Sequence, residues 1–80
     1  MNREAMNREA MSGGVHITVN GETRAMPLCS TVADLVAALG LLSTQVAVER
    51  NLQIVRRADH ATVVLAEGDR LEVVTFFGGG

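Results

Sequence analysis

The most informative stretch for the fold is Val15-His16-Ile17-Thr18-Val19-Asn20-Gly21, in which apolar and polar residues alternate and an Asn-Gly pair follows. Alternation with a period of two is typical of a half-buried β-strand. Asn-Gly is a strong hairpin signal, because a type I′ turn needs positive φ at both of its central residues. We therefore expect residues 22–26 to return antiparallel to the first strand. Pro27 should close that second strand, since proline cannot donate to a ladder.

A short amphipathic helix is predicted to follow the hairpin. Its apolar stripe has the i, i+3, i+4, i+7 spacing of one helix face and consists of Val32, Leu35, Val36 and Leu39. Ser30 or Thr31 can cap the helix, and Asp34 lies in the first turn, where a negative charge suits the helix dipole. Gly40 is the expected stop.

The next stretch is expected to form small elements. Leu41-Leu42 should cap the core beneath the helix end. Residues 46–50 are predicted to be a third strand, Asn51 a turn and residues 53–55 a short return. Residues 56–60 show no clear period, which indicates a loop or one turn of 3₁₀ helix.

The last strand is predicted over residues 70–77, after a tight turn at Glu67-Gly68-Asp69 with glycine at its centre. Residues 62–65 fit neither a strand nor a helix clearly. Alternation along the last strand assigns its side chains to two faces. One face carries Leu71, Val73, Thr75 and Phe77, and the other carries Glu72, Val74 and Phe76.

This order of elements predicts an α+β fold of the β-grasp, ubiquitin-like kind. We expect a mixed sheet of four to five strands with one main helix packed on one face. Right-handed crossovers allow the last strand to lie parallel to the first in the centre of the sheet. A helix bundle would need more helices, and a doubly wound sheet would need a longer chain.

The 80 residues are enough for one small domain. Residues 1–10 are the sequence MNREA written twice, and we expect residues 1–12 to be a disordered arm that reflects a start-site ambiguity or a cloning remnant. Residues 13–77 should form the domain and residues 78–80 a flexible glycine tail. The arm lacks the apolar core of a secretory signal, and no stretch approaches the length of a membrane span.

The composition of the chain limits the kinds of partner and the cellular compartment that we expect for it. The net charge of −2 argues against nucleic acid, which favours a basic face. The single cysteine, Cys29, excludes an internal disulfide and suits a reducing cytosol, so a cytoplasmic location is expected. All basic residues are arginines, which indicates a codon bias; an activated carboxyl group on this chain would find no lysine amine of its own to attack.

The chain ends in Gly78-Gly79-Gly80. A terminal glycine run makes a thin thread that reaches roughly 10 Å when extended, with no side chain to obstruct its entry into another protein's active site. It presents an α-carboxylate to that enzyme. A frayed chain end is the structural alternative.

The sequence resembles the ThiS family, the small sulfur carriers of thiamine thiazole synthesis. The likeness is carried, in order along the chain, by Val19-Asn20-Gly21, Thr31-Val32-Ala33-Asp34-Leu35-Val36, Val46-Ala47-Val48-Glu49-Arg50-Asn51, Gly68-Asp69-Arg70-Leu71-Glu72-Val73-Val74 and Phe77-Gly78-Gly79-Gly80. The related molybdopterin sulfur carriers share the Gly-Asp turn and the Gly-Gly end. They usually have prolines where this chain has Val74-Thr75-Phe76-Phe77. A departure from the ThiS pattern lies at Arg56-Arg57, where that family tends to have a proline before a single basic residue.

The resemblance implies a carrier rather than an enzyme. An E1-like adenylyltransferase would use ATP to convert the Gly80 carboxylate to an acyl-adenylate, and no cofactor would be bound stably. A persulfide from a cysteine desulfurase or a sulfur relay protein would then give a Gly80 thiocarboxylate. Thiazole synthase would take that sulfur. The free carrier is expected to be a monomer, with neither nucleic acid nor membrane as a partner.

Site residues follow from the same resemblance. Gly80 would carry the adenylate and then the sulfur, Gly79 would complete the tail, and Gly78 would act as a spacer. Phe77 falls on the core-facing set and should anchor the root of the tail, and it is also a candidate partner-docking residue. Val74 and Phe76 lie on the opposite face, where they form either a partner-docking patch or a surface covered by a loop.

Other chemistry-bearing residues are expected to be structural. His16 and His60 should lie on the surface, and no ligand cluster surrounds them. Cys29 should be a small packing residue, because no base partner accompanies it. Asp34 and Asp69 belong to a helix start and a turn rather than to an acid/base pair. Arg56-Arg57 should be a solvated loop, with an acidic partner surface as the alternative.

Three rival functions remain open on the sequence alone. A molybdopterin carrier would deliver the same thiocarboxylate to a different synthase. A ubiquitin-like modifier would form isopeptide bonds through the same adenylate, and conjugates in a lysate would reveal it. A β-grasp binding module would keep its function after deletion of Gly79-Gly80.

Overall fold

The computed structural model describes residues 14–76. Its elements, in chain order, are β1 (Gly14–Val19), β2 (Glu22–Pro27), α2 (Val32–Ala38), η1 (Ser43–Gln45), β3 (Val46–Arg50), β4 (Gln53–Val55), η2 (Arg57–Asp59) and β5 (Arg70–Thr75). The predicted arm of residues 1–12, Phe77 and the tail of residues 78–80 lie outside the described residues.

The hairpin predicted from Asn-Gly is present between β1 and β2. Val19 pairs with Glu22 across a two-residue loop, and Asn20 and Gly21 have φ values of 52° and 88°. Both are in the left-handed region that a type I′ turn requires. Pro27 is the last residue of β2, as expected for a residue without an N–H.

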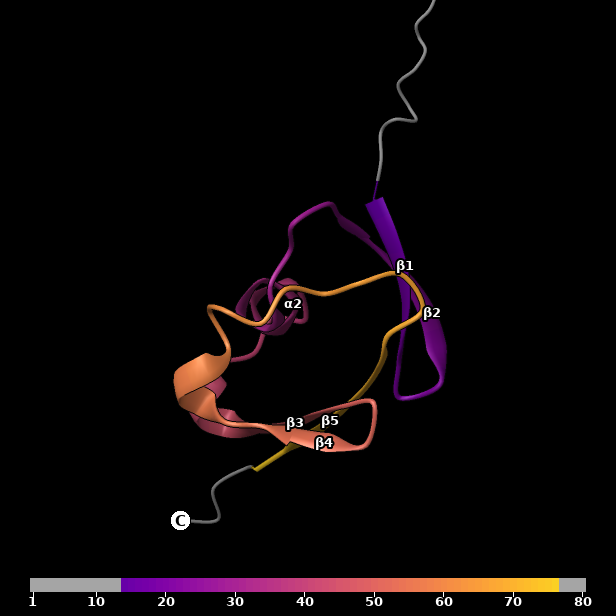
Figure 1. Ribbon diagram of the computed structural model, residues 1–80. Coiled ribbons are helices and arrows are strands. Elements are labelled where there is room, and N and C mark those ends of the chain that lie inside the picture. The colour runs from indigo at the N-terminus through magenta and orange to yellow at the C-terminus, as the bar shows by residue number, and fades with distance from the viewer. Residues whose placement is uncertain (1–13, 77–80) are drawn as a thin grey trace, which may run out of the picture.

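The sheet has the strand order β2-β1-β5-β3-β4. The central strands β1 and β5 run parallel, with Thr18 opposite Arg70 and Val19 opposite Leu71, whereas β3 is antiparallel to both β4 and β5. The sheet curves around α2, which covers one face and is seen end-on in Figure 1. The β-grasp prediction is confirmed, with five strands.

Helix α2 begins at a capping box. Thr31 Oγ1 accepts from the Asp34 N–H at 3.2 Å, and Asp34 Oδ2 accepts from the Thr31 N–H at 2.8 Å. Thr31 is therefore the cap, and Ser30 instead donates to the Pro27 carbonyl at 2.6 Å. The helix ends where predicted, with Gly40 at φ 76°.

The core lies between α2 and the inner face of the sheet. Its twelve buried apolar side chains are Val15, Ile17, Val19, Met26, Val32, Leu35, Val36, Val46, Val48, Leu65, Leu71 and Val73. Leu39 and Leu41 are partly buried against this cluster. Leu42, predicted to cap the core together with Leu41, is 63% exposed, because the chain turns outward there into η1. That half of the prediction is wrong.

Strand β5 is shorter than predicted within the described residues, ending at Thr75. Its alternation is as expected: Leu71 and Val73 are buried, and Glu72 and Val74 are exposed. Residues 62–65, which fitted neither pattern, form an irregular crossover from η2 to the turn before β5, anchored by buried Leu65 and an isolated bridge from Val64 to Thr31. None of the helices in residues 14–76 is long and apolar enough to span a membrane.

Candidate functional site

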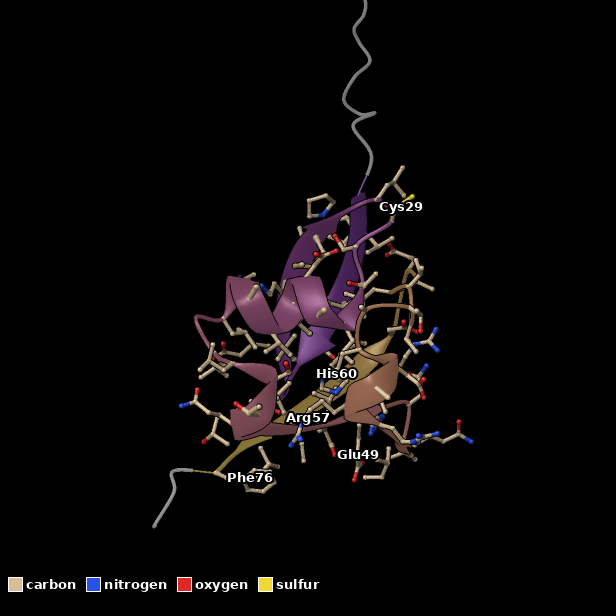
Figure 2. The ribbon with its side chains drawn as sticks, turned by 90° about the vertical axis from the view of Figure 1, so that its left-hand side faces the viewer. Cys29, Glu49, Arg57, His60 and Phe76 are labelled. Carbon is tan, nitrogen blue, oxygen red and sulfur yellow. The ribbon has the colours of Figure 1, made fainter. Side chains whose placement is uncertain are left out.

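The central strand β5 ends at Thr75, and in the sequence Phe76 and Phe77 separate it from the glycine tail. Phe76 follows β5 at the edge of the described range, and its N–H donates to the Gln45 carbonyl at 2.7 Å. Figure 2 shows Phe76 at the point where the chain leaves the sheet. Gly78, Gly79, Gly80 and Phe77, the other predicted site residues, lie beyond the part of the chain that the structure describes.

An apolar patch lies on the outer face of the sheet at the root of the tail. Val74 is 58% exposed and Phe76 is 53% exposed, so no segment of residues 14–76 covers them. Ile54 on β4 is exposed on the same face, since it pairs with Glu49, which in turn pairs with Glu72. We call Ile54, Val74 and Phe76 the outer patch.

The sequence reasoning did not include Ile54 in this patch. The signal was nevertheless present, because an Asn51 turn places Ile54 opposite Glu49 and therefore on the face that carries Glu72. That inference needs the pairing of β3 with β5, which a single sequence does not state.

Two carboxylates border the outer patch. Glu49 and Glu72 are directly opposite each other on β3 and β5. Within residues 14–76, neither carboxylate lies within 4.0 Å of a cationic nitrogen. Like charges placed opposite each other in a sheet are destabilising, and a cationic group from outside would relieve their repulsion.

Two asparagines hold β5 from both sides. Asn20, in the β1–β2 turn, accepts from the Val73 N–H at 2.8 Å and donates to the Val73 carbonyl at 3.1 Å through its side-chain amide. Asn51, in the β3–β4 turn, accepts from the Arg70 N–H at 2.9 Å, and its own N–H donates to the Arg70 carbonyl at 2.8 Å. Each asparagine has a φ of 52°. Together they fix the strand that leads to the tail.

Asp69 joins three segments of the chain. Its buried carboxylate accepts from Arg50 Nε at 2.8 Å, from Asn51 Nδ2 at 3.0 Å and from the Ala66 N–H at 2.8 Å. Burial alone would raise the pKa of this carboxyl group, but the hydrogen bonds from Ala66, Arg50 and Asn51 outweigh it and hold the pKa below its usual value. The group is thus a structural anion at the start of β5, as its turn position predicted.

Two predictions about reactive side chains are wrong. Cys29 is exposed rather than packed, since it lies in a turn after β2 with a φ of 68° that directs it away from the core. His60 is buried, with only 3% of its surface exposed. Its Nε2 lies 3.2 Å from the Val55 carbonyl, and the residue closes the space between η2 and the sheet (Figure 2).

The remaining candidates lie where the sequence placed them. His16 is exposed beside Glu67, with Nδ1 3.5 Å from a carboxylate oxygen. Arg56 and Arg57 are exposed, and Arg57 Nε donates to the Ser43 carbonyl at 3.2 Å. Asp34 belongs to the capping box of α2, whereas Asp69 binds Arg50, Asn51 and Ala66. The two carboxylates therefore have separate structural roles. No group of three potential metal ligands is found among residues 14–76.

The fold and the strand that ends at the outer patch define a ubiquitin-like β-grasp protein with a glycine-rich extension from its central strand. The sequence model of the ThiS family matches residues 17–80. The match covers most of the chain, and the chain belongs to the ThiS family.

A solved structure supports the same assignment. The chain is similar to the crystal structure of the thiamine biosynthesis protein ThiS from Geobacter metallireducens, with a TM-score of 0.69 and 29% sequence identity. The similarity covers 82% of this chain and 100% of that one.

Two curated relatives are thiazole synthases. The protein from Paramagnetospirillum magneticum is 47% identical over 64 residues, and the one from Magnetococcus marinus is 44% identical over 64 residues. Each match covers 80% of this chain and 20% of the relative. The chain therefore spans about a fifth of the length of the curated relatives that it matches.

Proposed function

We propose that this chain is a sulfur carrier of thiamine biosynthesis, and that its Gly80 carboxylate is converted to a thiocarboxylate for thiazole synthase. The observation that carries the proposal is the family match, which runs through Gly78-Gly79-Gly80 to residue 80. The thiazole synthases that contain a segment similar to this chain support such an enzyme as the recipient. The proposal requires a free α-carboxylate on Gly80.

Activation comes first because the free carboxylate is unreactive. An α-carboxyl group has a pKa of about 3.3–3.7 and is ionised at neutral pH, so sulfide does not displace its oxygen. An E1-like adenylyltransferase would join the Gly80 carboxylate to the α-phosphorus of ATP and release pyrophosphate. ATP belongs to that enzyme, and the carrier itself needs no stably bound cofactor.

Sulfur then replaces AMP. The terminal sulfur of a persulfide, supplied by a cysteine desulfurase or a relay protein, would form a bond to the Gly80 carbonyl carbon as AMP leaves. A thiol would cleave the resulting acyl disulfide, releasing the thiocarboxylate and a disulfide. The chain is a cosubstrate in this scheme and not an enzyme, and it would act as a monomer in the cytoplasm.

The described residues contribute position rather than chemistry. The outer patch of Ile54, Val74 and Phe76 would contact the activating enzyme and the synthase, with Glu49 and Glu72 meeting cationic side chains there. Docking a carrier fixes the reacting group near its target, which has the advantage of an intramolecular reaction. The two asparagine contacts keep β5, and hence the root of the tail, in one place.

The test is reconstitution followed by intact-mass measurement. With ATP, an E1-like enzyme, a cysteine desulfurase supplied with cysteine, and a thiol, the mass of the chain should rise by the difference between one sulfur and one oxygen, located on Gly80. Deletion of Gly79-Gly80 should abolish the gain and leave the fold unchanged. Cys29→Ser should retain the full gain. Sulfur found on Cys29 as a persulfide, with Gly80 unmodified, would contradict the proposal.

A further inference from the structure

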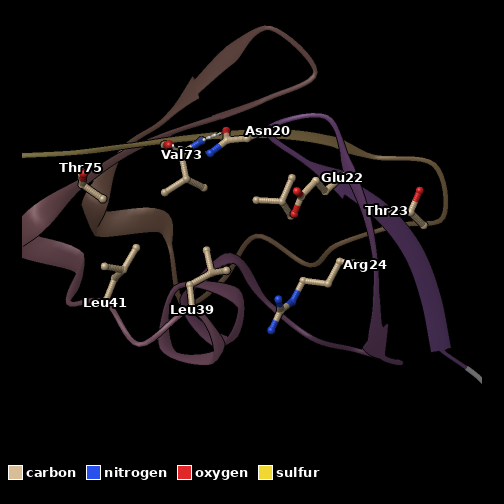
Figure 3. A pocket seen from close by; sticks show the side chains of 9 residues that line it. Asn20, Glu22, Thr23, Arg24, Leu39, Leu41, Val73 and Thr75 are labelled. Atoms are coloured by element: carbon tan, nitrogen blue, oxygen red, sulfur yellow. Dashed lines mark hydrogen bonds between the residues drawn. The ribbon is translucent and has the colours of Figure 1, made fainter.

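A groove opens on the inner face of the sheet, away from the outer patch. It encloses about 440 Å³ and is lined by Asn20, Arg24, Leu39, Leu41, Val73 and Thr75, among others (Figure 3). The groove exists because α2 is short. Its seven residues extend roughly 10 Å at 1.5 Å per residue, whereas six-residue strands such as β1 and β5 extend roughly 20 Å at 3.3 Å per residue.

One place in the sheet next to β5 is vacant. On the β1 side of β5, the Leu71 carbonyl accepts from the Asn20 N–H at 2.9 Å, and the Asn20 side chain then binds both backbone groups of Val73. Backbone groups of a strand alternate between its two sides. The N–H and C=O of Thr75 therefore point to the β1 side of β5, as those of Leu71 and Val73 do. The register of β1 with β5 stops at Val19 and Leu71, and no strand of residues 14–76 continues it.

Arg24 supplies an unneutralised cation at the same groove. Its Nε is buried and has no acceptor among the described residues, and its nearest hydrogen-bond contact is a long one of 3.5 Å from Nη2 to the Ala38 carbonyl. No carboxylate of residues 14–76 lies within 4.0 Å of the guanidinium. Glu22 lines the same groove, but its carboxylate does not form an ion pair with Arg24. Figure 3 shows the Arg24 side chain extending toward the helix end beside Leu39.

We propose that this groove binds an extended acidic peptide segment of a partner protein, which adds a short strand to the free edge of β5. The main chain of the peptide pairs with the N–H and C=O of Thr75. An aliphatic side chain enters between Leu39, Leu41 and Val73. Because Asn20 occupies the place in the sheet beside Val73, the peptide passes below Asn20 along the groove, and a carboxylate two residues away reaches Arg24 there.

A peptide fits these features better than a small anion does. An anion would use Arg24 alone, whereas the vacancy at Thr75 has the donor and acceptor pair of a β-ladder, which an extended main chain matches. Spacing of two residues puts both inward side chains on one face of the added strand. The site lies on the opposite face of β5 from the outer patch, so both faces could be occupied together.

The probes are two blocked pentapeptides, acetyl-Thr-Val-Thr-Asp-Thr-amide and its reverse order acetyl-Thr-Asp-Thr-Val-Thr-amide, each with a twin that has lysine in place of aspartate. The full 80-residue chain, labelled with ¹⁵N, is titrated and observed by NMR. One of the acidic peptides should give saturable shifts at the Thr75 amide, the Arg24 Nε–H and the Leu41 amide. Its lysine twin should bind at least about tenfold more weakly, as expected for loss of a charge-assisted hydrogen bond.

Three variants separate the contacts. Arg24→Gln should weaken the acidic peptide about tenfold and abolish its preference over the lysine twin. Glu22→Gln, on the same face of the same strand, should leave binding unchanged or tighten it, because it removes a like charge. Thr75→Pro should abolish binding, because it removes the N–H that pairs with the peptide. The β3–β5 ladder should persist, since the Thr75 N–H points away from β3. Retained hydrogen-exchange protection of the Val74 amide checks that the ladder is intact.

Several results would overturn the proposal. Equal binding of the acidic peptides and their lysine twins would remove the role of Arg24. Shifts confined to the amides of Thr23 and Ala25 would place the strand on β2 instead. A shift of the Arg24 Nε–H resonance by N-acetylaspartate amide that is as large as the shift caused by the acidic peptide, without a change at the Thr75 amide, would show that the groove binds an anion only. Absence of saturable shifts with both acidic peptides would refute peptide binding.

Discussion

Asn20 shows how much one turn residue contributes. Its backbone adopts the positive φ that the hairpin needs, and its side chain takes the place of a strand residue beside Val73. The sequence signal reported the first role only. The second role depends on Val73 of β5, which lies 53 residues further along the chain.

Asn20→Gly should destabilise the protein by about 1–3 kcal/mol, because the turn keeps its φ while both Val73 backbone groups lose a partner. The urea midpoint measures this loss. Leu52→Gly is the matched control, since Leu52 also has positive φ, 71°, and its side chain is exposed. It should be neutral or stabilising. Equal losses for both variants would show that the Asn20 side chain contributes nothing.

Asp69 makes stability depend on pH in the acid range. Its folded pKa lies below its usual value, so the unfolded chain binds the proton more readily, and folding stability rises with pH. The contribution is complete above the unfolded pKa of about 3.9 and is lost as the pH falls through and below that value.

The free energy of unfolding, measured by urea titration from about pH 7 to about pH 3, should therefore decline more for the native chain than for Asp69→Asn. The two curves should converge at the acid end. Parallel curves across this range would show that Asp69 is not the source of the acid sensitivity.

At the scale of elements, α2 packs against the core through its apolar stripe, which is recognisable in the sequence. Leu35 is fully buried at the centre of that stripe. Leu35→Ala should destabilise the fold by about 2–5 kcal/mol, the usual loss for a buried leucine. Ala37→Ser, on the exposed side of the same helix, is the control and should cost less than about 1 kcal/mol. An unchanged urea midpoint for Leu35→Ala would contradict the packing described for α2.

Local signals account for the elements that could be predicted. The Asn-Gly pair, the Thr31 cap and Gly40 each act within a few residues, so the hairpin and the helix were found with correct limits. His60, Cys29 and Leu42 were misplaced because their exposure depends on how the irregular segments fold over the core. Ile54 was missed for a related reason, since its face is known only once β3 is paired with β5.

At the scale of the whole molecule, the outer patch should matter for partners and not for folding. Phe76→Ser should leave the urea midpoint nearly unchanged, because the side chain is half exposed, and should slow thiocarboxylate formation about tenfold or more through loss of an interface aromatic. Ala25→Ser, on the same face at the far edge of the sheet, should leave the rate unchanged. Equal rates for both variants would place the docking surface elsewhere.

The central position of β5 also has a mechanical consequence. Under the proposed function, an enzyme that draws Gly80 into its active site would pull along the axis of β5, which is flanked by β1 on one side and β3 on the other. Tension in that direction shears the ladders, so the bonds on both flanks, with those of the two asparagines, share the force and must break together. If the proposed function holds, partner enzymes would bind the last residues of this carrier and release them repeatedly while the rest of the domain stays folded.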